Sequence, residues 1–289
     1  MPRPHCMFIQ AQDQPWRKGF PGGASAKGAT GERQSLDVKV LSVDPETGGS
    51  STIVRYPAGW QQTGSRYLSC HEEFLVLEGR LSLNGKDYGP YAYANLPAGY
   101  LRESFSAPQG AVVLAMVSAA PSEVEATTSG EMFDEKLLVE QIDVAPDGLE
   151  GWTENPYTRY LMGTGVRPLR EDPYTGEISI LYAALPFRFM EKQWTHPTVQ
   201  EMFVLSGEYA INDVGVMCPG SYAWWEPNNF HGPYGSHTGF MMFIRTVGGK
   251  LANAFGEEGI AIDYDAPYKP VVPEDLKPYA KAPVRRTLY

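Results

Sequence analysis

The chain repeats part of itself, and this repeat limits the possible folds more than any other feature of the sequence. Two segments match without a gap, VDPETGGSSTIVRYPAGW from Val43 and EDPYTGEISILYAALPFR from Glu171. The same offset of 128 positions joins Asp44 to Asp172, Gly48 to Gly176, Glu73 to Glu201 and Gly79 to Gly207. Chance similarity does not hold one offset over about thirty-five residues, so the sequence predicts a duplicated structural unit.

Each copy consists of short apolar segments separated by Gly, Pro, Asn and Asp. Alternating segments such as STIVRY, FLVLEG, ISILYAAL and MFVLSG are typical of β-strands. The segment DEKLLVEQI (134–142) is either a short helix or a further strand. Two copies of many short strands predict an all-β protein of two antiparallel barrels or sandwiches. We expect a first barrel with an N-terminal arm at 1–120, a linker at 121–160, a second barrel at 161–250 and a Pro-rich tail at 251–289.

The composition excludes several classes of partner. The chain has 289 residues, 43% of them hydrophobic, which is sufficient for a sizeable core. Its formal net charge of −10 argues against nucleic acid as a partner. Three separated cysteines and an N-terminus without an apolar leader predict a cytoplasmic protein with free thiols and no membrane span. We further expect a small-molecule substrate and a homodimer, in which pairing covers exposed strand edges.

Two motifs in the second copy resemble those of the cupin superfamily. The first is WTHPTVQEMFVLSG, with His196, Glu201 and Gly207 at the spacing of the family's first motif. The second is CPGSYAWWEPNNFH, which contains Pro219, Gly220, Pro227 and His231. The resemblance covers roughly 38–117 and 166–247 and implies a bicupin, that is, two tandem double-stranded β-helix (jelly-roll) barrels.

The resemblance also implies a metal site in the second barrel. His196, Glu201 and His231 match three of the four usual ligands, whereas Trp194 stands where the family has its first histidine. Pro197 follows His196 and predicts a strand end there, so that the three side chains come together at neighbouring strand ends. Two histidines and one carboxylate suit Fe(II), with Zn, Mn, Ni or Co as alternatives.

The first copy serves as an internal comparison. Leu68 and Leu101 occupy the positions that we match to His196 and His231, and only the glutamate is retained, as Glu73. Two leucines cannot bind a divalent ion, so we predict no metal in the first barrel.

Aromatic residues surround the predicted metal site and suggest an apolar pocket. The candidates for substrate binding are Trp194, Phe203, Trp224, Phe230, Arg188 and Arg245, and the candidates for a general base are Tyr222, Tyr234 and His237.

These features favour a metal-dependent enzyme, specifically a mononuclear non-haem Fe(II) dioxygenase that cleaves a carbon–carbon bond in an aromatic or diketone-like compound. One alternative is a redox-silent metal enzyme, an isomerase, lyase or decarboxylase of a carbonyl compound. Another is a bicupin that binds a small ligand without catalysis. The sequence does not decide the substrate, the metal or the role of the tail.

Overall fold

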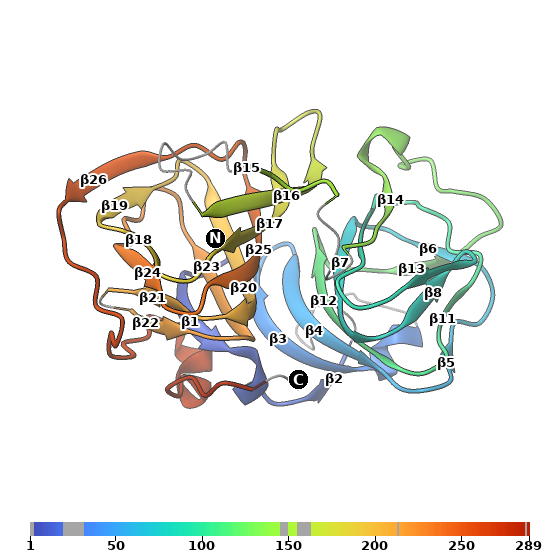
Figure 1. Ribbon diagram of the computed structural model, residues 1–289. Helices are drawn as coiled ribbons and strands as arrows, with labels where there is room; N and C mark the ends of the chain where they lie inside the picture. The colour runs from blue at the N-terminus through green and yellow to red at the C-terminus, as the bar shows by residue number, and fades with distance from the viewer. Residues whose placement is uncertain (1–2, 20–31, 145–149, 155–162, 213, 287) are drawn as a thin grey trace. The chain divides into compact units, whose positions relative to one another are not determined.

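A computed structural model describes residues 3–19, 32–144, 150–154, 163–212, 214–286 and 288–289. The chain divides into two compact units, the first made of 1–3 and 14–148 and the second of 4–13 and 149–289. Each unit is a set of antiparallel sheets (Figure 1), which confirms the predicted all-β fold.

The first unit is built on a seven-stranded sheet in the order β14-β10-β7-β12-β4-β3-β2, with a four-stranded sheet β5-β11-β8-β9 and a pair β13-β6. Its strands are β2 (Arg17–Lys18), β3 (Asp37–Val43), β4 (Ser50–Tyr56), β5 (Trp60–Gln61), β6 (Arg66–Leu68), β7 (Glu72–Gly79), β8 (Leu81–Leu83), β9 (Lys86–Tyr88), β10 (Tyr93–Leu96), β11 (Phe105–Ala107), β12 (Ala111–Val117), β13 (Glu123–Glu125) and β14 (Val139–Ile142). The short 3-10 helices of this unit are η2 (Glu32–Ser35) and η3 (Glu135–Leu137).

The second unit repeats this plan with the order β1-β23-β20-β25-β17-β16-β15, a four-stranded sheet β18-β24-β21-β22 and a pair β19-β26. Its strands are β1 (Cys6–Gln10), β15 (Thr153–Glu154), β16 (Thr164–Glu171), β17 (Ile178–Ala184), β18 (Arg188–Met190), β19 (Lys192–Thr195), β20 (Val199–Gly207), β21 (Tyr209–Ile211), β22 (Gly215–Met217), β23 (Ser221–Trp225), β24 (Tyr234–Ser236), β25 (Phe240–Val247) and β26 (Ala254–Glu258). Its 3-10 helices are η1 (Ala11–Asp13) and η4 (Glu274–Tyr279).

The strands at one edge of each large sheet come from outside the repeated segments. In the first unit, β14 pairs with β10, and the segment expected to be a helix or a strand contains both, η3 followed by β14. In the second unit, β1 pairs with β23, so the N-terminal arm that we had grouped with the first barrel contributes a strand to the second.

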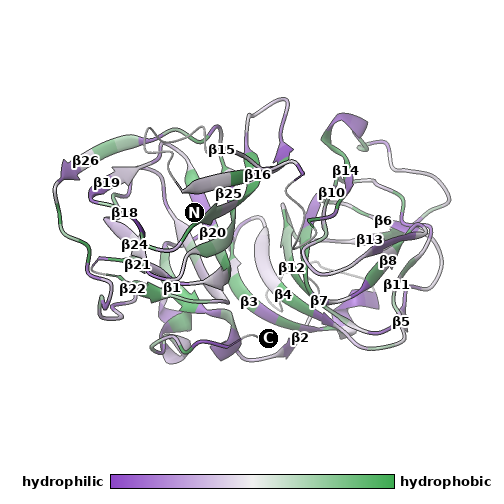
Figure 2. Cartoon of the chain, viewed as in Figure 1, coloured by the Kyte–Doolittle hydropathy of each residue, from purple (hydrophilic) through white to green (hydrophobic). Residues whose placement is uncertain are grey.

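Apolar residues of the strands fill one core in each unit. Figure 2 shows hydrophobic residues concentrated along the strands of both units. The second core is formed mainly by side chains of β17, β20 and β25, among them Ile180, Met202, Val204 and Met242. None of the helices in the described part of the chain has the length and apolar character that crossing a bilayer requires.

Candidate metal centre and cavity of the second unit

His196 and His231 come together at the end of strand β19. His196 follows that strand and precedes Pro197, which disfavours further regular pairing. His231 faces β19 through two backbone hydrogen bonds with Trp194, each 3.0 Å long. The two imidazole centroids are therefore only 5.2 Å apart. The two histidines that the sequence placed in one metal site are therefore neighbours, and their joint role as ligands stays a prediction.

Hydrogen bonding fixes the tautomer of both histidines. Nδ1 of His196 lies 3.0 Å from the carbonyl oxygen of Ala252, and Nδ1 of His231 lies 3.0 Å from that of Asn229. A carbonyl oxygen can only accept, so each Nδ1 carries the proton and each neutral ring has its lone pair on Nε2. Both Nε2 atoms are buried and have no hydrogen-bond partner among the described residues.

Burial keeps both rings neutral. It lowers the pKa of His196, an effect partly opposed by Ala252 and by the side chains of Gln200 and Asn253. Burial and the neighbouring His196 lower the pKa of His231 to about 3. Two neutral imidazoles with unpartnered Nε2 atoms have the protonation state that metal binding requires, and hydrogen bonds from Nδ1 to carbonyls are typical of metal ligands.

The spacing of the rings also fits a shared ion. With an Nε2–metal distance of about 2.0–2.1 Å, two adjacent ligands of one ion have ring centroids about 4.5–5.2 Å apart. The observed 5.2 Å lies at the upper end of that range. The distance between the rings is thus compatible with two ligands of one divalent ion.

Gln200, and not Glu201, lies on the same side of β20 as the histidine pair. Neighbouring residues of a strand point to opposite faces, and Gln200 lines the interior cavity together with His196 and Met202. Its Oε1 atom is buried and has no hydrogen-bond partner among the described residues. No group of three or more His, Cys, Asp or Glu side chains that could hold a metal occurs in the part of the chain that the structure describes.

Glu201 points to the opposite face of the sheet and has other partners there. Its Oε1 accepts a hydrogen bond of 2.7 Å from the hydroxyl of Tyr222, and its Oε2 pairs with Arg245. The first unit repeats this arrangement, because Tyr93 donates a 2.7 Å hydrogen bond to Glu73. The glutamate that both copies retain is therefore part of a buried Glu–Tyr pair, and its predicted position beside the histidines was wrong.

A cavity with an empty volume of about 600 Å³, part of it open to solvent, is lined by His196 but not by His231. Its wall is formed by Val166, Ile180, Tyr182, Met190, Trp194, His196, Gln200, Met202, Tyr209, Tyr234, Met242, Ile244, Leu251, Asn253 and Phe255. None of these lining residues is charged. Gly232 makes the Trp194 wall possible, because a Cβ atom at this glycine would lie 2.2 Å from the indole ring.

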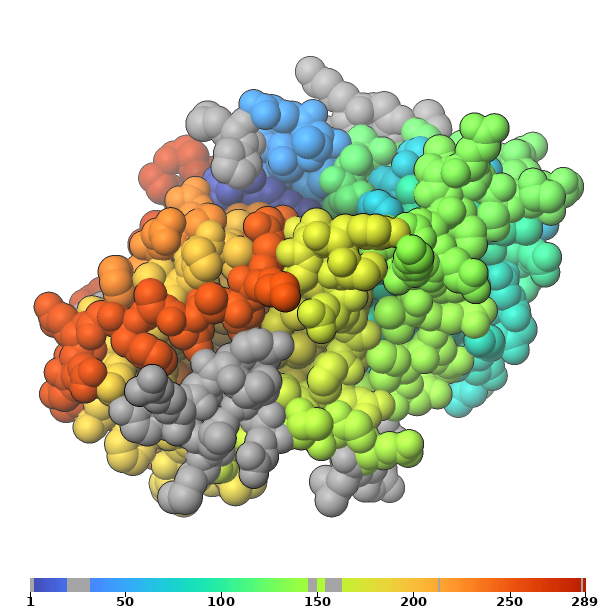
Figure 3. Space-filling view, turned by 90° about the horizontal axis from the view of Figure 1, so that it is seen from above, coloured from blue at the N-terminus to red at the C-terminus, as the bar shows by residue number. Residues whose placement is uncertain are grey.

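The C-terminal segment covers one side of this cavity. Strand β26 pairs with β19, and Leu251, Asn253 and Phe255 contribute to the lining. In Figure 3 the orange segment that includes β26 runs across the surface of the second unit. The tail whose role the sequence left open thus closes part of the pocket and, through Ala252, orients His196.

The other predicted binding and catalytic residues divide into two groups. Trp194, a candidate for substrate binding, and Tyr234, a candidate general base, both line the cavity. The remaining candidates lie elsewhere: Tyr222, Phe203, Trp224 and Arg245 on the Glu201 face of the sheet, Phe230 half exposed, Arg188 outside the cavity lining, and His237 exposed and stacked on Tyr264 at 3.9 Å. Tyr182 and Asn253 also line the cavity without having been candidates, and Gln200 was left out of the predicted ligand set.

Backbone pairing in the first unit changes which of its residues corresponds to His231. A bridge joins Arg66 to Arg102 there, just as a bridge joins Trp194 to His231 in the second unit. Arg102, and not Leu101, is therefore the counterpart of His231. Glu72 corresponds to Gln200 by the same offset of 128 positions.

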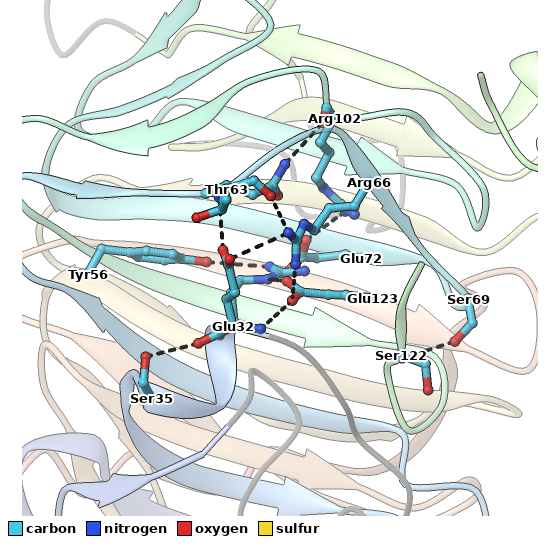
Figure 4. Close-up of polar contacts among 12 residues, drawn as sticks. Glu32, Ser35, Tyr56, Thr63, Arg66, Ser69, Glu72, Arg102, Ser122 and Glu123 are labelled. Carbon is cyan, nitrogen blue, oxygen red and sulfur yellow. Dashed lines mark hydrogen bonds and ion pairs between the residues drawn. The ribbon is translucent and has the colours of Figure 1, made fainter. Parts of the chain in front are cut away.

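These positions of the first unit belong to a buried ionic cluster (Figure 4). Glu72 pairs with Arg33 at 2.7 Å and with Arg102 at 2.8 Å. Glu123 pairs with Arg33 at 3.0 Å and with Arg66 at 3.4 Å. All five side chains are at most 7% exposed, so guanidinium and carboxylate groups fill the region where the second unit has its histidines.

Comparison with solved structures shows the fold class that these features define. The chain resembles a provisionally named dioxygenase of Nostoc punctiforme, with 17% identity, a TM-score of 0.72 and coverage of 85% of this chain and 82% of that one. It also resembles Bacillus subtilis oxalate decarboxylase, with 14% identity, a TM-score of 0.50 and coverage of 86% and 78%. A further structure of that enzyme, whose Mn(II) centres were characterised, gives a TM-score of 0.51 with the same identity and coverage. The fold is thus that of the bicupins over most of the chain.

The family model described as domain of unknown function DUF4437 matches residues 22–254. The protein therefore belongs to the DUF4437 family. No curated protein matches the sequence.

Proposed function

We propose that the second unit binds one divalent metal ion through His196, His231 and Gln200, and that the protein is a metal-dependent enzyme of the dioxygenase type. The observation that carries this proposal is the pair of buried Nε2 lone pairs without hydrogen-bond partners. A buried polar atom without a partner costs about 1–3 kcal/mol, and coordination of an ion removes this cost for both rings at once.

Fe(II) is the ion we propose, with Mn, Zn, Ni or Co as alternatives. Two imidazoles and one amide oxygen occupy three positions and leave the rest for small molecules. A bound Fe(II) ion would supply coordination of substrate and oxygen and the transfer of electrons between them. The residues themselves hold the imidazoles in one tautomer, through Ala252 and Asn229, and exclude water with the aromatic wall.

The cavity favours an aromatic or diketone-like substrate. Its wall is mainly aliphatic and aromatic, with Trp194, Tyr209 and Phe255 among its rings. Such a wall fits a flat unsaturated compound. None of the lining residues carries a positive charge, so the described side chains of the cavity wall provide no ion pair for a dicarboxylate such as oxalate.

The second candidate function is a barrel that binds a small molecule without a metal. Gln200 favours this second function, because its amide supplies no negative charge at the place where the resemblance to cupins implies a carboxylate. A neutral donor set binds a divalent ion less strongly than one with a carboxylate.

Elemental mass spectrometry of anaerobically purified protein tests the choice. We expect about one equivalent of iron per chain, and oxygen uptake on addition of catechol or acetylacetone in an oxygen electrode. Zinc or manganese without oxygen uptake would instead indicate a redox-silent metal enzyme. Protein that binds none of these ions, even after incubation with each under anaerobic conditions, would refute the proposed metal site and favour the binding barrel.

A further inference from the structure

Two tyrosine hydroxyls form a hydrogen-bonded pair in the wall of the mainly apolar cavity. Tyr182 of β17 and Tyr234 of β24 both line it, and their hydroxyl oxygens lie 2.9 Å apart. Their side chains are buried, with 9% and 3% of their surface exposed. Burial raises the pKa of both hydroxyls, so both keep their protons at neutral pH.

One of the two hydroxyl protons is not used in the hydrogen bond between the tyrosines. Two hydroxyl groups share a single hydrogen bond when one donates to the other, and the accepting group keeps its own proton. Neither tyrosine has a second acceptor for that proton among the described residues. A donor buried beside a cavity without an acceptor is costly unless a bound molecule supplies one.

The rings around the pair hold it in place near the histidines. Trp194 contacts Tyr234 at a centroid distance of 5.2 Å and His231 at 4.7 Å. Tyr209 packs against Tyr234 at 4.9 Å. His196 lines the same cavity as the two tyrosines, so one ligand can contact both.

The charge of Arg188 opposes the rise in the pKa of both tyrosines. This guanidinium group does not line the cavity, and the residues that do are uncharged. The described residues that line the cavity therefore offer no full charge that would pair with a charged ligand.

We propose that the Tyr182–Tyr234 hydroxyl pair binds the carbonyl oxygen of an uncharged, mainly apolar ligand. The assignment rests on the proposed function only in placing that ligand beside His196. It narrows the substrate class to neutral aromatic or unsaturated carbonyl compounds. It also makes the two tyrosines residues that determine specificity.

Two compounds of nearly the same shape test this proposal. Acetophenone has a carbonyl oxygen where α-methylstyrene has a methylene group, and benzoate adds a negative charge. We would measure binding of all three to metal-free full-length protein by ligand-observed NMR. We expect acetophenone to bind about tenfold more tightly than α-methylstyrene, since the methylene group leaves the donor unpaired. Benzoate should bind more weakly than acetophenone.

Phenylalanine variants provide the matched control. In the double variant Tyr182→Phe, Tyr234→Phe we expect the preference for acetophenone to disappear, whereas α-methylstyrene binding is retained. Tyr264→Phe removes a hydroxyl group of the second unit outside the cavity lining and should keep the preference. If the double variant does not fold, as judged by circular dichroism, the single variants serve, each with a reduced preference.

Three results would overturn the proposal: an unchanged preference in the folded variants, tighter binding of benzoate, or no binding of acetophenone at its solubility limit. Because these measurements use metal-free protein, they are separate from the metal content that tests the proposed function. Iron in the protein without a preference for acetophenone would refute only the tyrosine site. The preference without any bound metal would refute only the metal-dependent enzyme.

Discussion

Replacing Arg33 by methionine should destabilise the first unit strongly. The guanidinium group bonds to Glu72 at 2.7 Å and to Glu123 at 3.0 Å, and it is 1% exposed. Burial opposes its charge, but Glu72, Tyr56 and Glu123 outweigh this effect and raise the pKa of Arg33. Methionine keeps much of the side-chain volume but leaves both carboxylates with fewer buried partners.

The magnitude follows from the bonds that are lost. Each hydrogen bond to a charged group contributes about 1.5–3 kcal/mol, so two contribute about 3–6 kcal/mol, and we expect their loss to decrease the free energy of unfolding by about 3–5 kcal/mol. Breaking a buried ion pair by removal of one partner gives the same range. This decrease corresponds to an increase of about a hundred- to several-thousand-fold in the opening equilibrium of the unit.

Hydrogen–deuterium exchange of the full-length protein measures the opening equilibrium of the first unit. Peptides that cover β7 and β12 report it. The control is Arg80→Met, because Arg80 pairs with Asp87 at 3.2 Å on the surface with both side chains about half exposed. The control should change the free energy of unfolding by less than about 1 kcal/mol. A loss in Arg33→Met no larger than that of the control would refute the view that this cluster stabilises the first unit.

Two further predictions concern backbone geometry and pH. Gly207 has a φ of +72°, and a Cβ atom there would lie 2.0 Å from the carbonyl oxygen of Gly239, whereas Gly259 has the same φ with open space around it. In urea unfolding, Gly259→Ala should lower the free energy of unfolding by about 1–2 kcal/mol, because alanine disfavours a left-handed backbone. Gly207→Ala should lower it by clearly more, because its Cβ atom also clashes with Gly239. Equal losses in the two variants would contradict this. Burial raises the pKa of Tyr56 to about 12, so its neutral hydroxyl contributes stability that is complete below the unfolded pKa of about 10 and is lost as the pH rises towards 12. As the pH rises from about 10 to about 12, the urea midpoint should fall less steeply in Tyr56→Phe than in the unsubstituted protein. An identical slope in the two proteins would show that Tyr56 does not titrate as expected.

Much of the fold could be predicted from the sequence because the duplication is local and ungapped. Asp44 and Asp172 show why the repeat persists: each side chain accepts hydrogen bonds from the backbone N–H groups two and three residues later. The edge strands β1 and β14 lie outside the repeat, and their pairing depends on contacts distant in sequence. No local pattern could assign the N-terminal arm to the second unit.

The site was predicted in part. His196 and His231 were found by their spacing, but Glu201 was chosen over Gln200 although only the latter faces the cavity. Strand β20 is buried on both faces from Val199 to Leu205, so alternation of apolar and polar residues does not distinguish them. Charge made Glu201 the more obvious ligand, yet its real partners, Tyr222 and Arg245, are on other strands.

The most direct test of the metal site is the metal content of four variants after identical anaerobic purification. His196→Ala and His231→Ala should each lose most of the bound metal, because each removes one of two imidazole ligands. Glu201→Gln should keep it, since Glu201 lies on the opposite face, and His71→Ala should keep it because His71 belongs to the first unit. Metal retained in both histidine-to-alanine variants of the second unit, or lost in a folded Glu201→Gln variant, would contradict the site proposed here.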